Sequence, residues 1–275
     1  TYNIKPPVNH VSNDDFFEKM VDKVIASVDH KQIPAGQYDA VLIDEGHDFH
    51  PEWLKLVSQM VSPTTNSLLL LYDDAQSIYG QQKRGFSFKS VGIQAQGRTT
   101  ILRVNYRNTQ EILEFASKLV ANVLTPEEAD EDNIPRLAPV SAGRHGTKPL
   151  IVKLPSLPDE AKYITEKLLE AHNQGMSWKD MAVLYRGASD QKVMFEALSK
   201  AHIPFVGKTN MSFDEKEERV KLLTFHSSKG LEFPFVAIPS GKIITSKHSD
   251  EDEMKLMYVA MTRSTSQLLL TATVD

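Results

Sequence analysis

The strongest constraint on the fold is the octapeptide Val-Leu-Ile-Asp-Glu-Gly-His-Asp at residues 41–48. The apolar residues from Tyr38 to Ile43 predict a buried strand of a parallel sheet. Asp44 and Glu45 follow at its C-terminal end, where open α/β sheets bind ligands. In nucleotide hydrolases the first of two such carboxylates holds Mg²⁺, and the second activates water. A strand that ends in a solvated acidic turn explains the octapeptide equally well, so the rest of the chain must decide.

A second cluster of polar residues follows the apolar run 67–72, which predicts another buried strand. This cluster, Asp-Asp-Ala-Gln-Ser-Ile-Tyr at residues 73–79, includes Gln76, which could contact a terminal phosphate or its water. Aromatic and cationic residues then alternate in a way that suits stacked bases and phosphates of a single strand: Tyr79, Lys83, Arg84, Phe86, Phe88 and Lys89. The alternative is a solvated loop that its aromatic residues anchor.

The remaining chain alternates between strand and helix patterns, which predicts the α/β class. The expected strands are residues 99–104, 150–154, 181–185, 204–206, 220–224, 235–239 and 267–272. The expected helices cover residues 16–25, 51–61, 111–123, 159–173, 189–201 and 254–261. Residues 125–146, acidic and then rich in Pro, Ala and Gly, predict a long loop.

Residues that could bind phosphate or DNA lie at three of the places where a predicted strand or helix ends. Arg107 lies between a strand and a helix, where it could grip phosphate bidentately or form an ordinary surface ion pair. The strand 220–224 leads to Thr224 and His226, and then to a Ser/Lys/Gly turn whose hydroxyls and N–H groups could bind phosphate. The last helix leads to Thr262 and Arg263.

Composition narrows the choice of partner. The 275 residues suffice for one large or two ordinary domains, with 41% hydrophobic and 24% charged residues. The net charge of −5 gives no global signal for nucleic acid, so a DNA site must be a local groove. The absence of cysteine excludes disulfides and thiolate metal sites. No apolar run is long enough for a membrane helix, and we expect a cytoplasmic location and no membrane partner.

Taken in order, five stretches resemble the later motifs of superfamily 1 DNA helicases of the UvrD/Rep/PcrA type. They are Asp-Glu-Gly-His-Asp at 44–48, Asp-Asp-Ala-Gln-Ser-Ile-Tyr at 73–79, Asn-Tyr-Arg-Asn-Thr at 105–109, Thr-Phe-His-Ser-Ser-Lys-Gly-Leu-Glu-Phe at 224–233, and Tyr-Val-Ala-Met-Thr-Arg at 258–263. Any one could arise by chance, but five in the family's order is specific.

The resemblance implies RecA-like parallel sheets flanked by helices: residues 1–98 as the rear of a first RecA-like domain and residues 99–275 as a complete second one. It implies a nucleotide cleft between the domains, ATP with Mg²⁺ as cofactors, and movement along single-stranded or partly duplex DNA. By matching position, the resemblance implies that Asp44 holds Mg²⁺, that Glu45 is the general base and that Gln76 senses the terminal phosphate. Arg107 and Arg263 would be arginine fingers, and Glu232 and Gly230 would bind the nucleotide. The residues expected to contact DNA are Tyr79, Phe86, Thr224 and His226.

The chain departs from the family pattern in several places. It has no Gly-x-x-x-x-Gly-Lys-Ser/Thr loop, so we expect a C-terminal portion that does not hydrolyse ATP by itself. His47 replaces the usual glutamine, Tyr72 a glycine, and Gln81 an aromatic residue whose stacking role could pass to Phe86 or Phe88. The interval between Arg107 and Thr224 is short, so the accessory insertion is expected to be absent or reduced to residues 125–146.

Two other functions compete with the motor. One is a metal-dependent phosphoesterase built on Asp44, Glu45, His47, Asp48 and His50, which have the chemistry of metal ligands. The other is a degenerate helicase domain that serves only as a DNA- or protein-binding platform. The presence of Asp44, Glu45, Gln76, Arg107 and Arg263 together argues against degeneracy, because a binding module has no need for all five.

Overall fold

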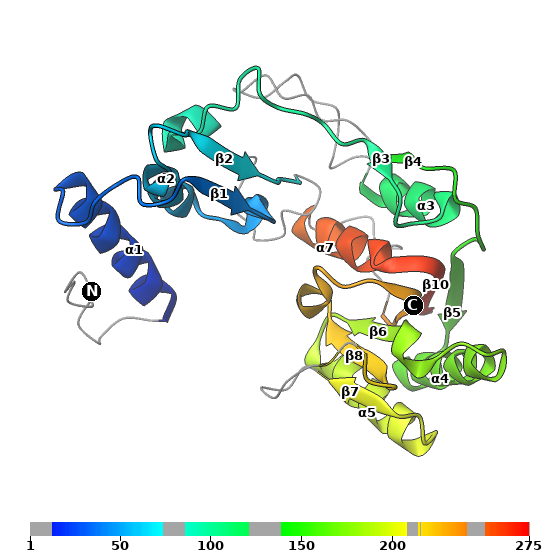
Figure 1. Ribbon diagram of the computed structural model, residues 1–275. Helices are drawn as coiled ribbons and strands as arrows, with labels where there is room; N and C mark the ends of the chain where they lie inside the picture. Colours follow the sequence, from blue (N-terminus) through cyan, green and yellow to red (C-terminus); the bar gives the residue numbers. More distant parts are fainter. Residues whose placement is uncertain are drawn as a thin grey trace. The chain divides into compact units, whose positions relative to one another are not determined.

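The computed structural model describes residues 13–73, 86–120, 139–207, 214, 216–240 and 251–274. The chain forms two compact units, one of Thr1–Ile101 with Glu127–Pro135 and one of Leu102–Pro126 with Arg136–Asp275 (Figure 1). Within the described ranges, no helix is both long enough and apolar enough to cross a membrane.

The first unit is built around two parallel strands. Its helices and strands are α1 (Asn13–Asp29), β1 (Ala40–Ile43), α2 (Pro51–Met60) and β2 (Ser67–Leu70), with short 3₁₀ turns at Gly46–Asp48 and Phe88–Val91. Strand β1 pairs with β2 in parallel register. Pro51 occupies the first turn of α2, where its missing N–H costs nothing. The small core joins Ile43 and Leu54 to Phe88, Val91 and Ile93.

The two strands of this unit are less buried than the sequence predicts. Their apolar runs indicated fully buried strands, but Leu42 is 73% exposed and Leu69 is 51% exposed. Strands of a parallel sheet are buried when neighbouring strands and helices cover both faces. Among the described residues this sheet has only the two strands β1 and β2. The prediction of burial on both faces was therefore wrong for this part of the chain.

The second unit contains a six-stranded parallel sheet of order β5-β10-β9-β6-β8-β7. Its strands are β5 (Leu150–Leu154), β6 (Met181–Tyr185), β7 (Phe205–Gly207), β8 (Val220–Thr224), β9 (Phe233–Ile238) and β10 (Ser264–Thr273). Its helices are α3 (Gln110–Val120), α4 (Leu157–Asn173), α5 (Ala188–Lys200) and α7 (Glu251–Thr262).

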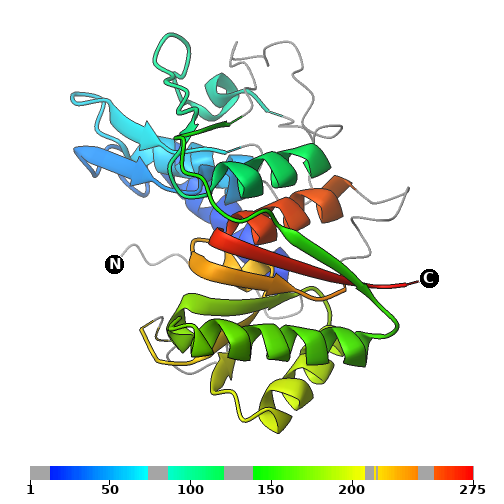
Figure 2. The same cartoon turned by 90° about the vertical axis from the view of Figure 1, so that its right-hand side faces the viewer.

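Helices cover both faces of this sheet (Figure 2). Helices α4 and α5 lie on one face, and α3 and α7 lie on the other. Leu168 of α4 and Leu198 of α5 pack with Val183 and Leu222 of the sheet in one apolar core. Every residue of the central strand β6 is buried, as a continuous apolar run in a doubly covered sheet requires. The predicted α/β class is confirmed by this six-stranded sheet.

The strand predicted at residues 99–104 is mostly absent. Only β3 (Val104–Asn105) forms, and it pairs with the equally short β4 (Val140–Ser141). Leu102 is 85% exposed and lies outside any strand. Apolar and β-branched residues favour a strand only where a neighbour supplies the ladder and the packing. Here the neighbour is two residues long, so the strand is too.

A buried carboxylate stabilises the C-terminal edge of the large sheet. Glu160, in the first turn of α4, is completely buried. Its carboxylate accepts hydrogen bonds from the backbone N–H of Ser240 at 2.8 Å and from the hydroxyls of Thr271 and Thr273 at 2.6 Å each. The Ser240 hydroxyl in turn donates to Asp190 at 2.8 Å. Glu160 thus joins α4 to the ends of β9 and β10.

We expect Glu160→Ala to lower the free energy of unfolding by about 3 kcal/mol, since it leaves buried donors without an acceptor. Urea denaturation of a Trp53→Phe background would report the second unit through Trp178 fluorescence. Glu166→Ala is the matched control, because its ion pair with Lys162 is exposed and should be worth at most about 0.5 kcal/mol. Equal midpoints for the two variants would contradict the assignment.

Candidate functional site

The acidic residues after β1 form a tight turn. Asp44 Oδ1 accepts a hydrogen bond from the backbone N–H of Glu45 at 2.9 Å. Glu45 itself has left-handed backbone angles, φ 51° and ψ 40°, which cost a non-glycine residue on the order of 1 kcal/mol. The next residue, Gly46, lies so close to β2 that an added Cβ would be 2.2 Å from Leu70 Cδ1. The turn therefore fixes the direction in which the Glu45 carboxylate points.

His47 links this turn to the end of β2. Its side chain is only 2% exposed, and its Nε2 lies 3.0 Å from Glu45 Oε2. Its Nδ1 accepts a hydrogen bond from the backbone N–H of Asp73 at 3.2 Å. Since Nδ1 accepts, the neutral ring carries its proton on Nε2 and donates it to Glu45. His47 thus holds the Glu45 carboxylate and joins the two loops that the sequence singles out.

This arrangement does not support the metal-dependent phosphoesterase. Both ring nitrogens of His47 already have polar partners. No group of three or more His, Asp or Glu side chains able to hold a metal ion occurs in the part of the chain that the structure describes, which includes residues 44–50. The His50 ring lies 4.9 Å from the Trp53 ring, on α2.

The aromatic residues expected to stack on DNA bases differ in their surroundings. Tyr79 lies outside the described residues, and so does Gln76, which was predicted to contact the terminal phosphate. Phe88 is only 5% exposed and belongs to the core of the first unit, with its ring edge-on to Tyr72 at 5.5 Å. Phe86 is half-buried and packs against the same core. Phe88 was therefore a wrong candidate for base stacking, because it is a core residue.

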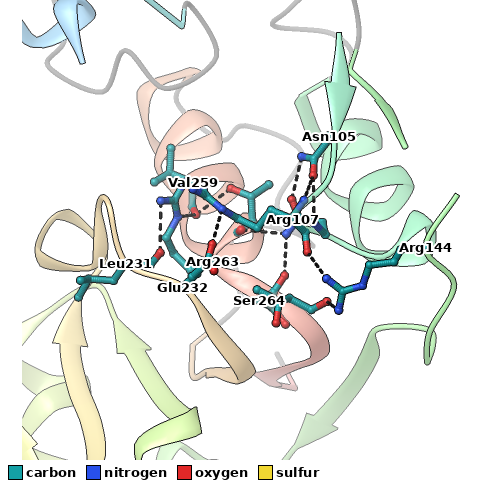
Figure 3. A network of polar contacts seen from close by, with 11 residues as sticks. Asn105, Arg107, Arg144, Leu231, Glu232, Val259, Arg263 and Ser264 are labelled. Carbon is teal, nitrogen blue, oxygen red and sulfur yellow. Dashed lines mark hydrogen bonds and ion pairs between the residues drawn. The ribbon is translucent and has the colours of Figure 1, made fainter. Parts of the chain in front are cut away.

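In the second unit, three predicted nucleotide-binding residues converge from distant parts of the sequence (Figure 3). Arg107 Nε donates to Glu232 Oε2 at 2.9 Å, and this ion pair is 38% and 58% exposed. Arg263 Nη1 approaches the carbonyl of Leu231, the residue before Glu232, at 3.4 Å. Arg263 is itself only 1% exposed, and its Nε donates to Val259 O at 3.0 Å.

Local backbone geometry shapes the segment that presents Glu232. Gly230 has φ +80°, a left-handed conformation that side chains rarely adopt. No atom of the described residues lies within 4 Å of a Cβ built there, so conformation and not crowding favours glycine. Thr224 Oγ1 donates to Ser227 Oγ and accepts from the Ser227 N–H, which tightens the turn at the start of this segment.

The predicted DNA residues lie at the opposite edge of the sheet from the Glu232 region. Thr224 pairs with Tyr185 at the C-terminal end of β6. Phe235 pairs with Met181 at the N-terminal end of β6, and Glu232 precedes that point. The levels of Thr224 and Phe233 are therefore six residues apart along the strands, or about 20 Å. Thr224 and His226 therefore lie at the C-terminal ends of the strands, whereas Glu232 and Arg263 lie at the N-terminal ends.

An ion pair borders His226 at the C-terminal edge. Arg186, which follows β6, forms a bidentate pair with Glu253 in the first turn of α7, with Nε 2.9 and 3.0 Å from the two carboxylate oxygens. Desolvation lowers the pKa of the His226 imidazole, and the charges of Arg186 and Lys229 lower it further, while Glu253 acts in the opposite direction. His226 therefore favours its neutral form.

We expect the NMR titration midpoint of His226 to lie below its ordinary value of 6.5. Because the folded pKa is the lower one, His226 contributes its full stability above pH 6.5 and loses it as the pH falls toward the folded pKa. Arg186→Gln should raise the midpoint, since it removes a cation and leaves the Glu253 charge uncompensated. Lys179→Gln, an exposed cation in the same unit, serves as the control. A midpoint that stays unchanged in Arg186→Gln would contradict the electrostatic explanation.

Comparison with known proteins identifies the family of this chain. The chain matches the UvrD-like helicase C-terminal domain over residues 100–218 and 207–275, well over half of its length. The chain belongs to this family. The match covers the segments that carry Arg107, Thr224, Glu232 and Arg263 in this UvrD-like domain.

The relatives of this UvrD-like chain are helicases of greater length. DNA helicase II of Haemophilus influenzae is 30% identical over 190 residues, 66% of this chain and 24% of the relative. The ATP-dependent DNA helicase PcrA of Staphylococcus aureus is 25% identical over 193 residues, 69% of this chain and 25% of the relative. A solved C-terminal domain of a possible DNA helicase from Lactobacillus plantarum aligns over 62% of this chain and 88% of that chain, at 19% identity and a TM-score of 0.45. The chain spans about a quarter of the length of the curated relatives it matches.

Several residues around these sites were not found by sequence reasoning. The buried amide of Asn108 joins the segment of Arg107 to the backbone on either side of Arg263. Arg144 comes from the predicted long loop, and Arg186 and Glu253 come from ordinary element ends.

Proposed function

We propose that this chain is the C-terminal part of an ATP-dependent DNA helicase or translocase that couples ATP hydrolysis to movement on single-stranded DNA. In this proposal, residues 1–98 are the rear of a first RecA-like domain and residues 99–275 are the second. The chain by itself is not expected to hydrolyse ATP, because it has no Gly-x-x-x-x-Gly-Lys-Ser/Thr loop.

The observation that carries the proposal is the convergence of Arg107, Glu232 and Arg263. These residues come from three separate motifs, and together they offer two guanidinium groups and one carboxylate. Guanidinium groups bind phosphate bidentately, and a carboxylate can accept hydrogen bonds from ribose hydroxyls. The proposal assigns Arg107 and Arg263 to the terminal phosphate and Glu232 to the ribose. The Arg107–Glu232 ion pair must open when the two side chains take these ligands.

The first unit fits the hydrolytic half of the proposal. Asp44 offers a single carboxylate, which suits Mg²⁺ because this ion keeps several waters and needs few protein ligands. Bound Mg²⁺ would neutralise charge on the phosphates. Glu45 would orient the attacking water and accept its proton. His47 holds the Glu45 carboxylate at 3.0 Å, which limits the positions that the base can occupy.

Nucleic acid is assigned to the opposite edge of the large sheet, where Thr224 and His226 lie. The separation of about 20 Å along the strands supports distinct nucleotide and DNA sites within the second unit. A neutral His226 can donate or accept a hydrogen bond without adding charge. Tyr79 and Phe86 are proposed as further DNA contacts in the first unit.

The test is ATP hydrolysis by the complete natural protein that contains this chain, measured with Mg²⁺ in the presence and absence of single-stranded DNA. The proposal expects hydrolysis that single-stranded DNA stimulates and that chelation of Mg²⁺ abolishes. A protein that binds DNA in fluorescence anisotropy but hydrolyses no ATP would instead be the binding platform. A comparison with single-stranded RNA of the same sequence shows whether DNA or RNA stimulates hydrolysis.

A further inference from the structure

One buried amide joins the two segments that carry Arg107 and Arg263. Asn108 is fully buried, and its Nδ2 donates to the carbonyl of Thr262 at 2.9 Å and to that of Ser264 at 2.6 Å. These are the residues on either side of Arg263, so Asn108 holds the backbone of Arg263 from both sides. Both amide hydrogens are thereby used, although Asn108 and Ser264 are 156 residues apart in sequence.

The same amide also belongs to the turn that positions Arg107. Asn108 Oδ1 accepts from Asn105 Nδ2 at 2.9 Å. Asn105 Oδ1 accepts from the backbone N–H groups of Arg107 at 2.9 Å and Asn108 at 3.0 Å. A side-chain oxygen that accepts from following N–H groups fixes the local backbone in an Asx turn. The conformation at Arg107 is thus tied to the contacts of Asn108.

A guanidinium forms a second link between the same segments. Arg144 Nη1 donates to Arg107 O at 2.9 Å, and its Nη2 donates to Thr265 O at 3.1 Å and to Ser266 Oγ at 3.3 Å. The carbonyl of Arg144 accepts from the N–H of Gln110, at the first residue of α3. Arg144 is exposed, whereas Asn108 is buried, so the two links differ in their access to water.

We infer that Asn108 and Arg144 are positioning residues that hold the backbone segments of Arg107 and Arg263 as one mechanical unit. The inference rests on the proposed function for its catalytic consequence. It requires a side chain with two donors and one acceptor at position 108. Serine offers one donor and a shorter reach, so it cannot bridge both carbonyls.

The test measures ATP turnover by the complete natural protein with Asn108→Ser, Arg144→Lys and the control Gln110→Ala, whose side chain donates to Glu114 on its own helix. Asn108→Ser should lower kcat between about tenfold and 10²-fold, as expected for misplaced catalytic groups. Arg144→Lys should lower kcat less and should not restore wild-type turnover, because an ammonium lacks the planar fork. Gln110→Ala should leave kcat unchanged.

A double-mutant cycle separates positioning from general destabilisation. In an Arg107→Ala, Arg263→Lys background, Asn108→Ser should cost little further turnover, because the groups that it positions are already lost. A purely structural role would instead give the same fold loss of kcat in both backgrounds, which would overturn the inference. Unchanged kcat in Asn108→Ser would overturn it as well.

Hydrogen exchange keeps the inference testable if the protein hydrolyses no ATP. Asn108→Ser should raise amide exchange both at residues 105–111 and at residues 262–266, since the two segments open together. Faster exchange in only one segment would overturn the mechanical link. Faster exchange in both segments of a protein without ATP hydrolysis would retain the link and reject the proposed function.

Discussion

If the proposed function holds, Glu45→Gln is expected to lower the DNA-stimulated kcat of the complete natural protein by about 10²-fold or more. A glutamine amide has nearly the volume of the carboxylate, but it cannot accept a proton from the attacking water. The surrounding geometry should survive, because the amide oxygen can still accept a hydrogen bond from His47 Nε2, as Oε2 of Glu45 does at 3.0 Å. The loss should therefore appear in kcat and not in the KM for ATP.

Two measurements make this result specific. Glu52→Gln removes an exposed carboxylate on α2 of the same unit. It should leave kcat within about twofold of the wild-type value, because surface substitutions away from a functional site are usually near neutral. Binding of a fluorescent ATP analogue should persist in Glu45→Gln. If Glu45→Gln hydrolyses ATP at the wild-type rate, Glu45 is not the base and the hydrolytic assignment of the first unit fails.

The sequence predicted the second unit well, because its strands are covered on both faces. Residues 181–185 are a short continuous apolar run, and all five are buried in β6. Helix α4 and strand β5 also lie close to their predicted limits. Local pattern succeeded here because each element meets the neighbours that its pattern assumes.

The same pattern failed where the neighbours differ. The runs at Leu42 and Leu69 look like core strands, but burial on both faces needs a layer packed over each face of the sheet, and both side chains are exposed in the described part of the chain. Phe88 was chosen as a stacking residue because aromatic residues near cations resemble a nucleic-acid surface. Only the folded chain shows that Phe88 packs with Leu54 and Val91.

Long-range polar contacts were beyond the sequence for another reason. The bridge from Asn108 to Ser264 joins residues 156 positions apart, and neither lies in a pattern of spacing that could indicate it. Arg144 comes from a segment whose composition indicated only a loop. Motifs located Arg107 and Arg263, but the groups that hold them became visible only through geometry.

Arg107→Ala is expected to reduce kcat by about 10³-fold or more, the size of effect found when an arginine finger is removed from a phosphoryl-transfer enzyme. Arg107 is a better probe than Arg263, which is 1% exposed and whose truncation would leave a cavity. The Arg107 side chain is 38% exposed, and its ion pair with Glu232 faces solvent. Losing such a pair should change the free energy of unfolding by at most about 1 kcal/mol.

Arg219→Ala provides the matched comparison for this prediction. Arg219 lies in the same unit, and its Nε forms an exposed ion pair with Glu217 at 3.1 Å, with side chains 49% and 37% exposed. The two variants should unfold at nearly the same urea concentration, but only Arg107→Ala should lose turnover. Equal kcat values would reduce Arg107 to a surface ion pair. A large loss of kcat with unchanged stability would instead require that Arg107 leave Glu232 and stabilise charge on the transferred phosphate.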